Sequence, residues 1–513
     1  MNLRKYILIA GMMVLALGVM QAQDNPAPPS DSQTSPQQPV AAYGQENAPQ
    51  PIAENPPLSG MDLPSLQEHA APLSYLQPGA TFSESASTNI GNQLGGSNSV
   101  GSISRGLGTL ALKRLWSHYD LALDYMGGAA YYQKGGLGWK TLQDLGIEQK
   151  VLWKRGQLSL RDSFSYLPEG NFGASYGSLG SIGIAGMGNS GFSSFFNGTG
   201  LATFGLTPRI MNISVGEFQE NLNPKSAITA TGGYAFTHFY GSDFTGASFI
   251  GSSQVSGQAG YNRTLTSHTQ IAAIYGYQGF DFTVSGTAFH SHVVQGMYGH
   301  RISGRMDLML AAGPQVTFLD TPTEVCSDPT IPAFLCEALG GTLSPLTIKS
   351  TKIGVAAQAR LRYRFSKNSM DLRYERFETS GGGLFAGAQT DMVRLTLDHP
   401  LSRVWSTSFD LGFSHNDRLQ PLTPQQQGAC LQQNQNSQTA CPANDAKTYS
   451  DGFAGVAVHR YFGRTWHGFA SYQFSELQFD HSFCVAGTPC DRISNRQIVT
   501  FGLDWTPRPI RID

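Results

Sequence analysis

The stretch that decides the fold is RLRYRFSK, residues 360–367. Its arginines occupy every second position and alternate with Leu361, Tyr363 and Phe365. A period of two is the period of a β-strand with one polar and one apolar face. The stretch then ends in Ser-Lys, a polar segment of the kind that bounds strands. It therefore predicts a strand that finishes at a short turn.

Seven short turns of this basic or polar kind recur along the last three quarters of the chain. They are residues 154–156, 222–225, 263–266, 301–304, 364–367, 400–403 and 460–463. Each is flanked by about ten residues in which apolar and polar side chains alternate, which is near the length of a tilted membrane strand. Tight turns at one end and longer loops at the other are typical of a transmembrane β-barrel. The sequence thus predicts an all-β, antiparallel, up-and-down barrel.

Counting strands from the turns gives about eighteen, within a range of roughly sixteen to twenty. An even number is expected, because single-chain bacterial barrels have even numbers of strands. We place the first strand near residues 81–89 and the last at residues 496–505. Both chain ends then lie at the turn end of the barrel. No apolar run beyond the N-terminus reaches the length of a membrane-spanning helix, and only 14% of the residues are charged.

The N-terminal region predicts export. Residues 1–22 have the basic start and apolar stretch of a signal peptide, and residues 23–77 have the Pro- and Gln-rich composition of a disordered linker. We assign residues 78–513 to the barrel and its long loops. The formal net charge of −2 gives no indication of nucleic-acid binding.

Six cysteines fall in three close pairs, which are Cys326 with Cys336, Cys430 with Cys441, and Cys484 with Cys490. Six cysteines allow fifteen connectivities, but each close pair lies within one predicted loop. Local disulfides that staple the loops are therefore expected in an oxidising compartment. The competing interpretation is a zinc site, which needs ligands two to four residues apart. We expect no metal and no cofactor.

A set of charged residues follows the polar faces of consecutive predicted strands. Its members are Arg360, Arg362, Arg364, Asp371, Arg373, Glu375, Arg394, Asp398 and Asp410. If these side chains line a water-filled pore, their field biases which solutes pass. The alternative is that they are cross-strand ion pairs that stiffen the wall. Pairing Arg364 with Asp371 would place Arg362 opposite Arg373.

Two further features have an open interpretation. The Gly-, Ser- and Phe-rich segment 167–205 is long enough to fold inward as a constriction loop through Phe192, Phe195 and Phe196; the alternative is a surface loop. His290 and His292 share one strand face, but without a third ligand they favour a lumen or interface pair over a metal site.

The last strand adds a signal of its own. Val499, Phe501, Leu503 and Trp505 share one face. It is similar to the terminal strand that outer-membrane assembly machinery recognises, although Thr506–Asp513 continue beyond its aromatic end. Together with the turns, residues 78–505 resemble porin-like outer-membrane β-barrels of Gram-negative bacteria. The resemblance implies passive diffusion of small hydrophilic solutes, contact with outer-membrane lipid and with the assembly machinery, and a homo-oligomer as an open alternative.

Two other functions stay open. One is a barrel that serves a surface polysaccharide export or secretion pathway. The other is a plugged structural or adhesive barrel that displays its loops. No spacing of Asp, His or Ser singles out a catalytic set, and we do not expect an enzyme.

Overall fold

The computed structural model describes residues 74–90, 100–133, 138–167, 208–240, 249–283, 287–327, 336, 341–365, 368–381, 383–420, 446–463, 465–480 and 493–512. Within that part of the chain, no helix is long and apolar enough to cross a membrane. The predicted signal peptide and nearly all of the predicted linker lie outside the described residues.

The described residues form nineteen strands. They are β1 Tyr75–Thr88, β2 Val100–Leu115, β3 Tyr119–Tyr132, β4 Gly138–Trp153, β5 Gly156–Leu167, β6 Arg209–Asn223, β7 Ser226–Phe239, β8 Ser252–Thr266, β9 Thr269–Phe282, β10 Ala288–Ser303, β11 Met306–Cys326, β12 Leu343–Arg364, β13 Ser369–Thr379, β14 Ala388–Pro400, β15 Trp405–Arg418, β16 Thr448–Phe462, β17 Trp466–Phe479, β18 Ile493–Trp505 and β19 Ile510–Arg511. Because β1 begins at Tyr75, residues 75–77 belong to the barrel and not to the linker.

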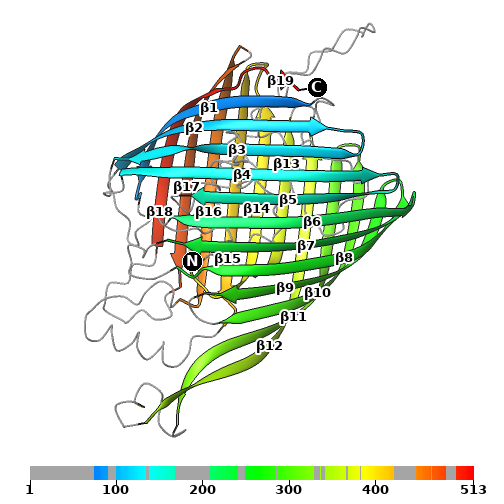
Figure 1. The fold of residues 1–513 in the computed structure, drawn as a ribbon, viewed down its shortest axis with the longest axis vertical. Helices are drawn as coiled ribbons and strands as arrows, with labels where there is room; N and C mark the ends of the chain where they lie inside the picture. The colour runs from blue at the N-terminus through cyan, green and yellow to red at the C-terminus, as the bar shows by residue number, and fades with distance from the viewer. Residues whose placement is uncertain are drawn as a thin grey trace. The chain divides into compact units, whose positions relative to one another are not determined.

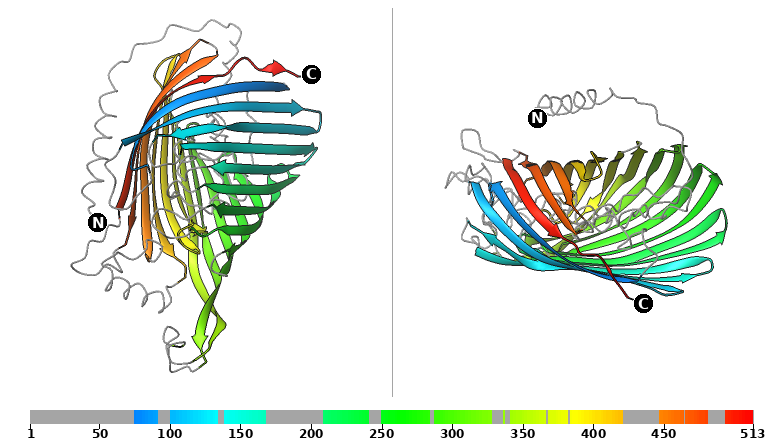
Figure 2. Two further views of the ribbon diagram at one scale, coloured as in Figure 1. Left: turned by 60° about the vertical axis from the view of Figure 1, so that its left-hand side comes forward. Right: turned by 90° about the horizontal axis from the view of Figure 1, so that it is seen from above.

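The sheet closes on itself. Strands β1 to β18 each pair antiparallel with their neighbours in the chain (Figure 1), and β18 returns to β1 from Ala80↔Trp505 to Ser87↔Ile498. The expected closed antiparallel barrel of eighteen strands is thereby confirmed. Residues beyond β18 continue as the two-residue β19, which pairs with Tyr75 and Leu76 at the start of β1. Figure 2 shows β18 beside β1 at the closure.

Short connections gather at one end of the barrel, which we call the turn end. All seven predicted turns lie there, and an eighth at residues 116–118 joins β2 to β3. One predicted turn was placed early: Arg263–Thr266 complete β8, and the turn itself is Ser267–His268. The connections at the opposite end, which we call the loop end, include the long segments 168–208 and 419–447.

The apolar and polar faces are arranged inside out relative to a water-soluble protein. On β15, Phe409, Leu411 and Phe413 are 38–42% exposed, whereas the alternating Asp410 and Ser414 are 3% and 0% exposed. A soluble sandwich would bury the aromatic side chains instead. A closed ring of eighteen strands with apolar side chains outward is the architecture of porin-like outer-membrane barrels.

A polar cluster interrupts the outward face between β5 and β6. The carboxylate of Asp162 accepts a hydrogen bond of 3.1 Å from the amide of Asn212 and another from the hydroxyl of Ser214. All three side chains share the outward face with Leu160 and Phe218. Hydrogen bonding within the cluster lowers the cost of placing a carboxylate against lipid.

Strands β11 and β12 extend past their neighbours at the loop end (Figure 1). The last residue of β11 that pairs with β10 is Asp320, whereas its pairing with β12 runs on to Cys326↔Leu343. Cys326 is joined to Cys336 by a disulfide, as expected. Cys430, Cys441, Cys484 and Cys490 lie outside the described residues.

The two faces of β14 should differ in how much stability a new charge costs. Leu395 lies on the outward face between Leu372 and Leu411, whereas the adjacent Thr396 lies on the inward face between Asp371 and Asp410. Leu395→Arg should lower the free energy of unfolding in lipid vesicles by about 2–4 kcal/mol. Thr396→Arg is the matched control and should cost much less, because it gains carboxylate partners. Urea-induced unfolding in vesicles measures both, and equal losses would contradict the assignment of the faces.

Candidate functional site

The predicted charged residues lie on the inward face of four adjacent strands, β12 to β15. Arg360 pairs in register with Arg373, and Arg373 with Arg394, so the polar face is continuous across the strands. The predicted pairing was wrong by two residues: Arg364 lies opposite Ser369, and Arg362 lies opposite Asp371. Because side chains alternate with a period of two, this shift leaves every residue on its predicted face.

Asp371 is the centre of the first ion-pair group. Its Oδ2 lies 2.6 Å from Nη2 of Arg360 and 3.3 Å from Nε of Arg362. One carboxylate therefore faces two guanidinium groups, and it offsets only part of their charge. Arg373 lies alongside and reaches Glu375 at 3.8 Å.

Arg394 and Asp410 form the second group. The guanidinium donates two hydrogen bonds to the carboxylate, Nε to Oδ1 at 3.0 Å and Nη2 to Oδ2 at 2.7 Å. The guanidinium carbon also lies 5.7 Å from the ring centre of Phe453 on β16. Bidentate pairing fixes the orientation of Arg394. Asp398, opposite Ser369, is exposed, unlike the other members of the predicted set whose side chains the structure describes.

The set as a whole leaves a small positive excess. Its nine predicted members comprise five arginines and four carboxylates, which gives a formal charge of +1. The side chain of Arg364 lies outside the described part of the chain. We name these nine residues the charged wall. The ion pairs of the charged wall agree with the interpretation that these residues stiffen the sheet. Their inward position also allows them to act on solutes, so the two interpretations are compatible.

A second feature of the site is the tip of the hairpin between β13 and β14. Pairing of β13 with β12 ends at Ala357↔Arg376, and from Phe377 onward β13 leaves the wall. The connecting residues 380–387, of which 382 is not described, are buried or half-buried. We call residues 380–387 the hairpin tip.

Glycines give the hairpin tip its course. Gly381, Gly383 and Gly387 have φ angles of 77°, 83° and 94°, which side chains with a Cβ rarely adopt. A Cβ at Gly381 would also lie 2.6 Å from the carbonyl oxygen of Phe385. The turn therefore folds tightly back on itself and presents Leu384 and Phe385 to the interior.

The hairpin tip reaches both walls of the barrel. The ring of Phe385 packs against that of Tyr449 on β16 at 5.1 Å between centroids. On the other side, the backbone N–H of Ile250, just before β8, donates to the carbonyl of Gly383 at 2.8 Å. Ile250 leads into β8, and strands β8 and β16 are eight positions apart in the ring of eighteen, so these contacts lie on nearly opposite walls. The tip therefore crosses the interior at the loop end.

Glu378 anchors the base of the hairpin tip. Its side chain is 2% exposed, and it accepts a hydrogen bond from the hydroxyl of Thr317 on β11. Ser291 on β10 and Gln278 on β9 also hydrogen-bond to this carboxylate. Three nearby strands of the ring, β9, β10 and β11, thus hold one side chain of β13.

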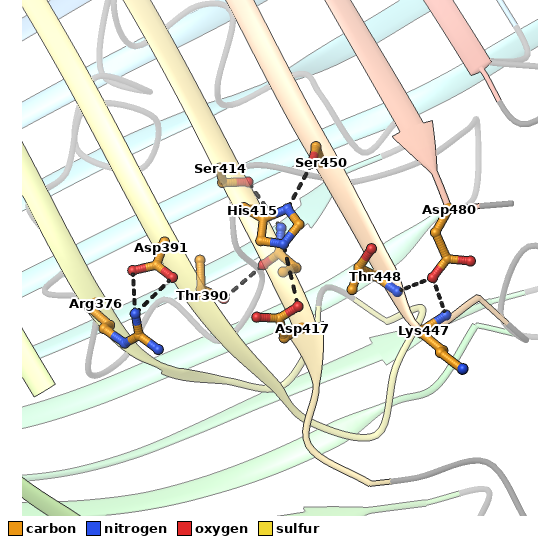
Figure 3. Close-up of polar contacts among 11 residues, drawn as sticks. Arg376, Thr390, Asp391, Ser414, His415, Asp417, Lys447, Thr448, Ser450 and Asp480 are labelled. Carbon is orange, nitrogen blue, oxygen red and sulfur yellow. Dashed lines mark hydrogen bonds and ion pairs between the residues drawn. The ribbon is translucent and has the colours of Figure 1, made fainter. Parts of the chain in front are cut away.

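Polar contacts also brace the strand ends around the hairpin tip (Figure 3). On β15 the ring of His415 contacts Ser450 at 2.9 Å through Nδ1 and Asp417 at 3.3 Å through Nε2. The carboxylate of Asp480, after β17, accepts the backbone N–H groups of Lys447 and Thr448. These contacts fix the ends of β15, β16 and β17 against one another.

The sequence analysis did not find the hairpin tip. The signal that could have found it is the run of glycines at 381–383 and 387 around Leu384 and Phe385. The predicted constriction residues Phe192, Phe195 and Phe196 lie outside the described residues, and that prediction stays untested.

The histidine pair lies on the outward face. His292 shares a hydrogen bond of 2.7 Å with the hydroxyl of Tyr275, and the ring of His290 stacks on Phe318 at 5.1 Å. Across the ranges that the structure covers, no group of three His, Cys, Asp or Glu side chains could hold a metal ion.

Comparison with known proteins finds solved structures of similar fold but no matching family. No protein-family model matches the chain, and no curated protein matches its sequence. Among solved structures, OpdQ of Pseudomonas aeruginosa is 11% identical with a TM-score of 0.40, covering 85% of this chain and 98% of OpdQ. The outer membrane channel DcaP of Acinetobacter baumannii is 8% identical with a TM-score of 0.35, covering 86% and 99%. The ferric-catecholate import receptor Fiu of E. coli K12 is 8% identical with a TM-score of 0.41, covering 84% and 81%. Likeness at this level does not bear on function.

Removing the central carboxylate of the charged wall should change ion selectivity. Asp371→Asn leaves Arg360 and Arg362 without their shared counter-charge, so the inward field becomes more positive. The zero-current potential in a KCl gradient should then shift toward chloride selectivity. Asp391→Asn is the matched control, because Asp391 pairs with Arg376 on the outward face and should leave the potential unchanged. An unaltered potential in Asp371→Asn would show that this wall does not act on permeating ions.

Proposed function

We propose that this protein is an outer-membrane channel for the passive diffusion of small hydrophilic solutes. The observation that carries the proposal is the closed ring of eighteen strands whose inward face is polar and charged and whose outward face is apolar. An apolar girdle suits lipid, and a polar interior lowers the cost of moving hydrated solutes through it. Barrels of sixteen to eighteen strands are wide enough for an aqueous channel.

The proposed orientation follows from the connections. Bacterial outer-membrane barrels have short periplasmic turns and longer extracellular loops. The turn end would therefore face the periplasm, together with both ends of the barrel sequence, and the loop end would face outward. In this orientation a solute would meet the hairpin tip first and the charged wall afterwards.

The hairpin tip supports a second candidate. A segment that contacts both walls and is buried along its length would also suit a plugged barrel whose role is to display its loops. The two candidates differ in one measurable property, the passage of ions through the folded protein.

Refolded protein in planar lipid bilayers should show stable current steps of uniform size in KCl. The reason is that the inward face offers charged and hydroxyl groups to water along the barrel wall. Folding is checked by resistance of the barrel to unfolding in cold detergent, and vesicles without protein serve as the blank. Folded protein that inserts and stays silent would favour the plugged barrel and overturn the channel.

Loosening the hairpin tip should raise the current. Phe385 is fully buried, packs against Tyr449, and lies 4.4 Å under the guanidinium carbon of Arg418. Phe385→Ala removes these contacts and should give larger or more frequent open steps. The control is Phe413→Ala, which removes an outward ring of the same size from β15. Identical current steps in Phe385→Ala and the unaltered protein would contradict a narrowing role for the tip.

A further inference from the structure

The outward face of β5 to β8 differs from the outward face across the ring (Figure 1). On β12 to β15, four leucines lie side by side in one outward row: Leu361, Leu372, Leu395 and Leu411. On β6, β7 and β8, one outward row consists of Gly216, Gly232 and Gly257. Leucine side chains suit hydrocarbon, whereas small residues are typical of places where two membrane proteins approach closely.

No side chain of the described residues covers this glycine row. A Cβ built on Gly232 would meet only a backbone oxygen, at 3.9 Å. Exposed side chains stand on the rows at either side, Tyr234 and Val255 toward the loop end and Phe218 and Tyr275 toward the turn end. The glycines therefore leave a strip without side chains between two lines of exposed ones.

The polar cluster on β5 and β6 lies beside the glycine row and deep in the apolar band. Asp162 is six residues along β5 from Gly156, which is in register with Trp153. The indole N–H of Trp153 donates to Glu220, and tryptophan is enriched at the edge of the apolar band. With a rise of about 3.4 Å per residue and a tilt of about 40°, Asp162 lies roughly 15 Å from that edge. This is near the middle of a band about 25 Å tall.

The polar cluster is only partly satisfied from within. The carboxylate of Asp162 receives the side-chain N–H of Asn212 at 3.1 and 3.3 Å and the hydroxyl of Ser214. An ionised carboxylate accepts about four hydrogen bonds, and all three side chains are half-buried, so part of the cluster faces hydrocarbon. Lipid tails have no donor to offer. A donor at this depth must come from another protein in the membrane, and ionisable groups so placed are typically functional.

The same face carries a donor of its own. Tyr234 is exposed, lies in register with Ser214, and has a phenol O–H that can donate. A two-fold axis along the membrane normal through β6 would set β5 of each copy against β7 of the other. Asp162 of each copy then faces Tyr234 of the other, and Gly216 lies near the axis, where the two copies come closest. The two carboxylates stay on opposite sides of the axis, so the face is complementary to itself.

We propose that the outward face of β5 to β8 joins two copies of this protein into a two-fold dimer in the membrane. We name the following residues the dimer face: Asp162, Asn212, Ser214, Gly216, Gly232, Tyr234 and Gly257. This inference goes beyond the proposed function, because it concerns the outward surface and holds whether or not the barrel conducts.

Förster energy transfer between donor- and acceptor-labelled protein in phosphatidylcholine vesicles, recorded at increasing lipid-to-protein ratio, measures the association. Gly232→Leu places a side chain on the glycine row, where the single barrel has room for it, and should weaken association roughly tenfold. Gly108→Leu is the matched control. It adds the same side chain to the outward face of β2, where a Cβ would meet only the carbonyl oxygen of Gly127, at 3.8 Å, and it should leave association unchanged.

A second pair of variants tests the hydrogen bond between the copies. Tyr234→Phe removes one hydroxyl and keeps the ring, so it should weaken association by roughly threefold to tenfold. Tyr472→Phe is its control on the outward face of β17, because Tyr472 is 41% exposed and Tyr234 is 45% exposed. Association of the control should equal that of the unaltered protein.

Energy transfer from two copies that falls in Gly232→Leu and Tyr234→Phe, and in neither control, supports the dimer face. Unaltered protein that stays monomeric overturns it, and this is the result expected if lipid or a different protein covers the face. An oligomer of more than two copies, or equal losses in a variant and its control, overturns it as well. If Gly232→Leu misfolds, Tyr234→Phe decides the question.

Discussion

Backbone hydrogen bonding in lipid is the constraint on which this structure depends. Hydrocarbon offers no partner for an open strand edge, so a sheet that spans a membrane must close. Here closure falls to the pairing of β18 with β1, from Ala80↔Trp505 to Ser87↔Ile498, between segments more than 400 residues apart in the chain. The residues after β18 lengthen the closing contact with β1, because β19 pairs with Tyr75 and Leu76 of that strand. The tail that sets this sequence apart from barrels ending on an aromatic residue thus has a place in the sheet.

Closure also explains why so much of the fold could be predicted from sequence. Once one face meets lipid and the other the interior, each strand must alternate, and alternation such as that of residues 360–365 is visible locally. Register is less visible, because it depends on how many residues the turn uses. The connection between β12 and β13 spans residues 365–368. It is two residues shorter than the connection implied by pairing Arg364 with Asp371, so the pairing moved by two residues. The faces survived because the shift was even.

The inward fold of the hairpin tip could not be predicted, because it depends on contacts with residues far away in the sequence. Residues 380–387 fold inward through contacts with Tyr449 on one wall and Ile250 on the other, and nothing near them in sequence specifies those partners. Glycine at 381, 383 and 387 permits the path without dictating it. The ion pairs of Asp371 were equally hard to predict. The residue types could be read directly from the sequence, whereas the pairing of Asp371 with both Arg360 and Arg362 depends on the register of β12 against β13.

The extended β11–β12 hairpin has a consequence for what the cell presents to its surroundings. Strands β11 and β12 pair with each other as far as Cys326↔Leu343, whereas the pairing of β11 with β10 stops at Asp320. The Cys326–Cys336 disulfide lies at the end of this hairpin. With the proposed orientation, this arm is what an antibody or a bacteriophage tail fibre meets before the membrane. Since it stands clear of the ring, it could diversify under immune or viral pressure, or accept a grafted epitope, while the wall beneath stays intact.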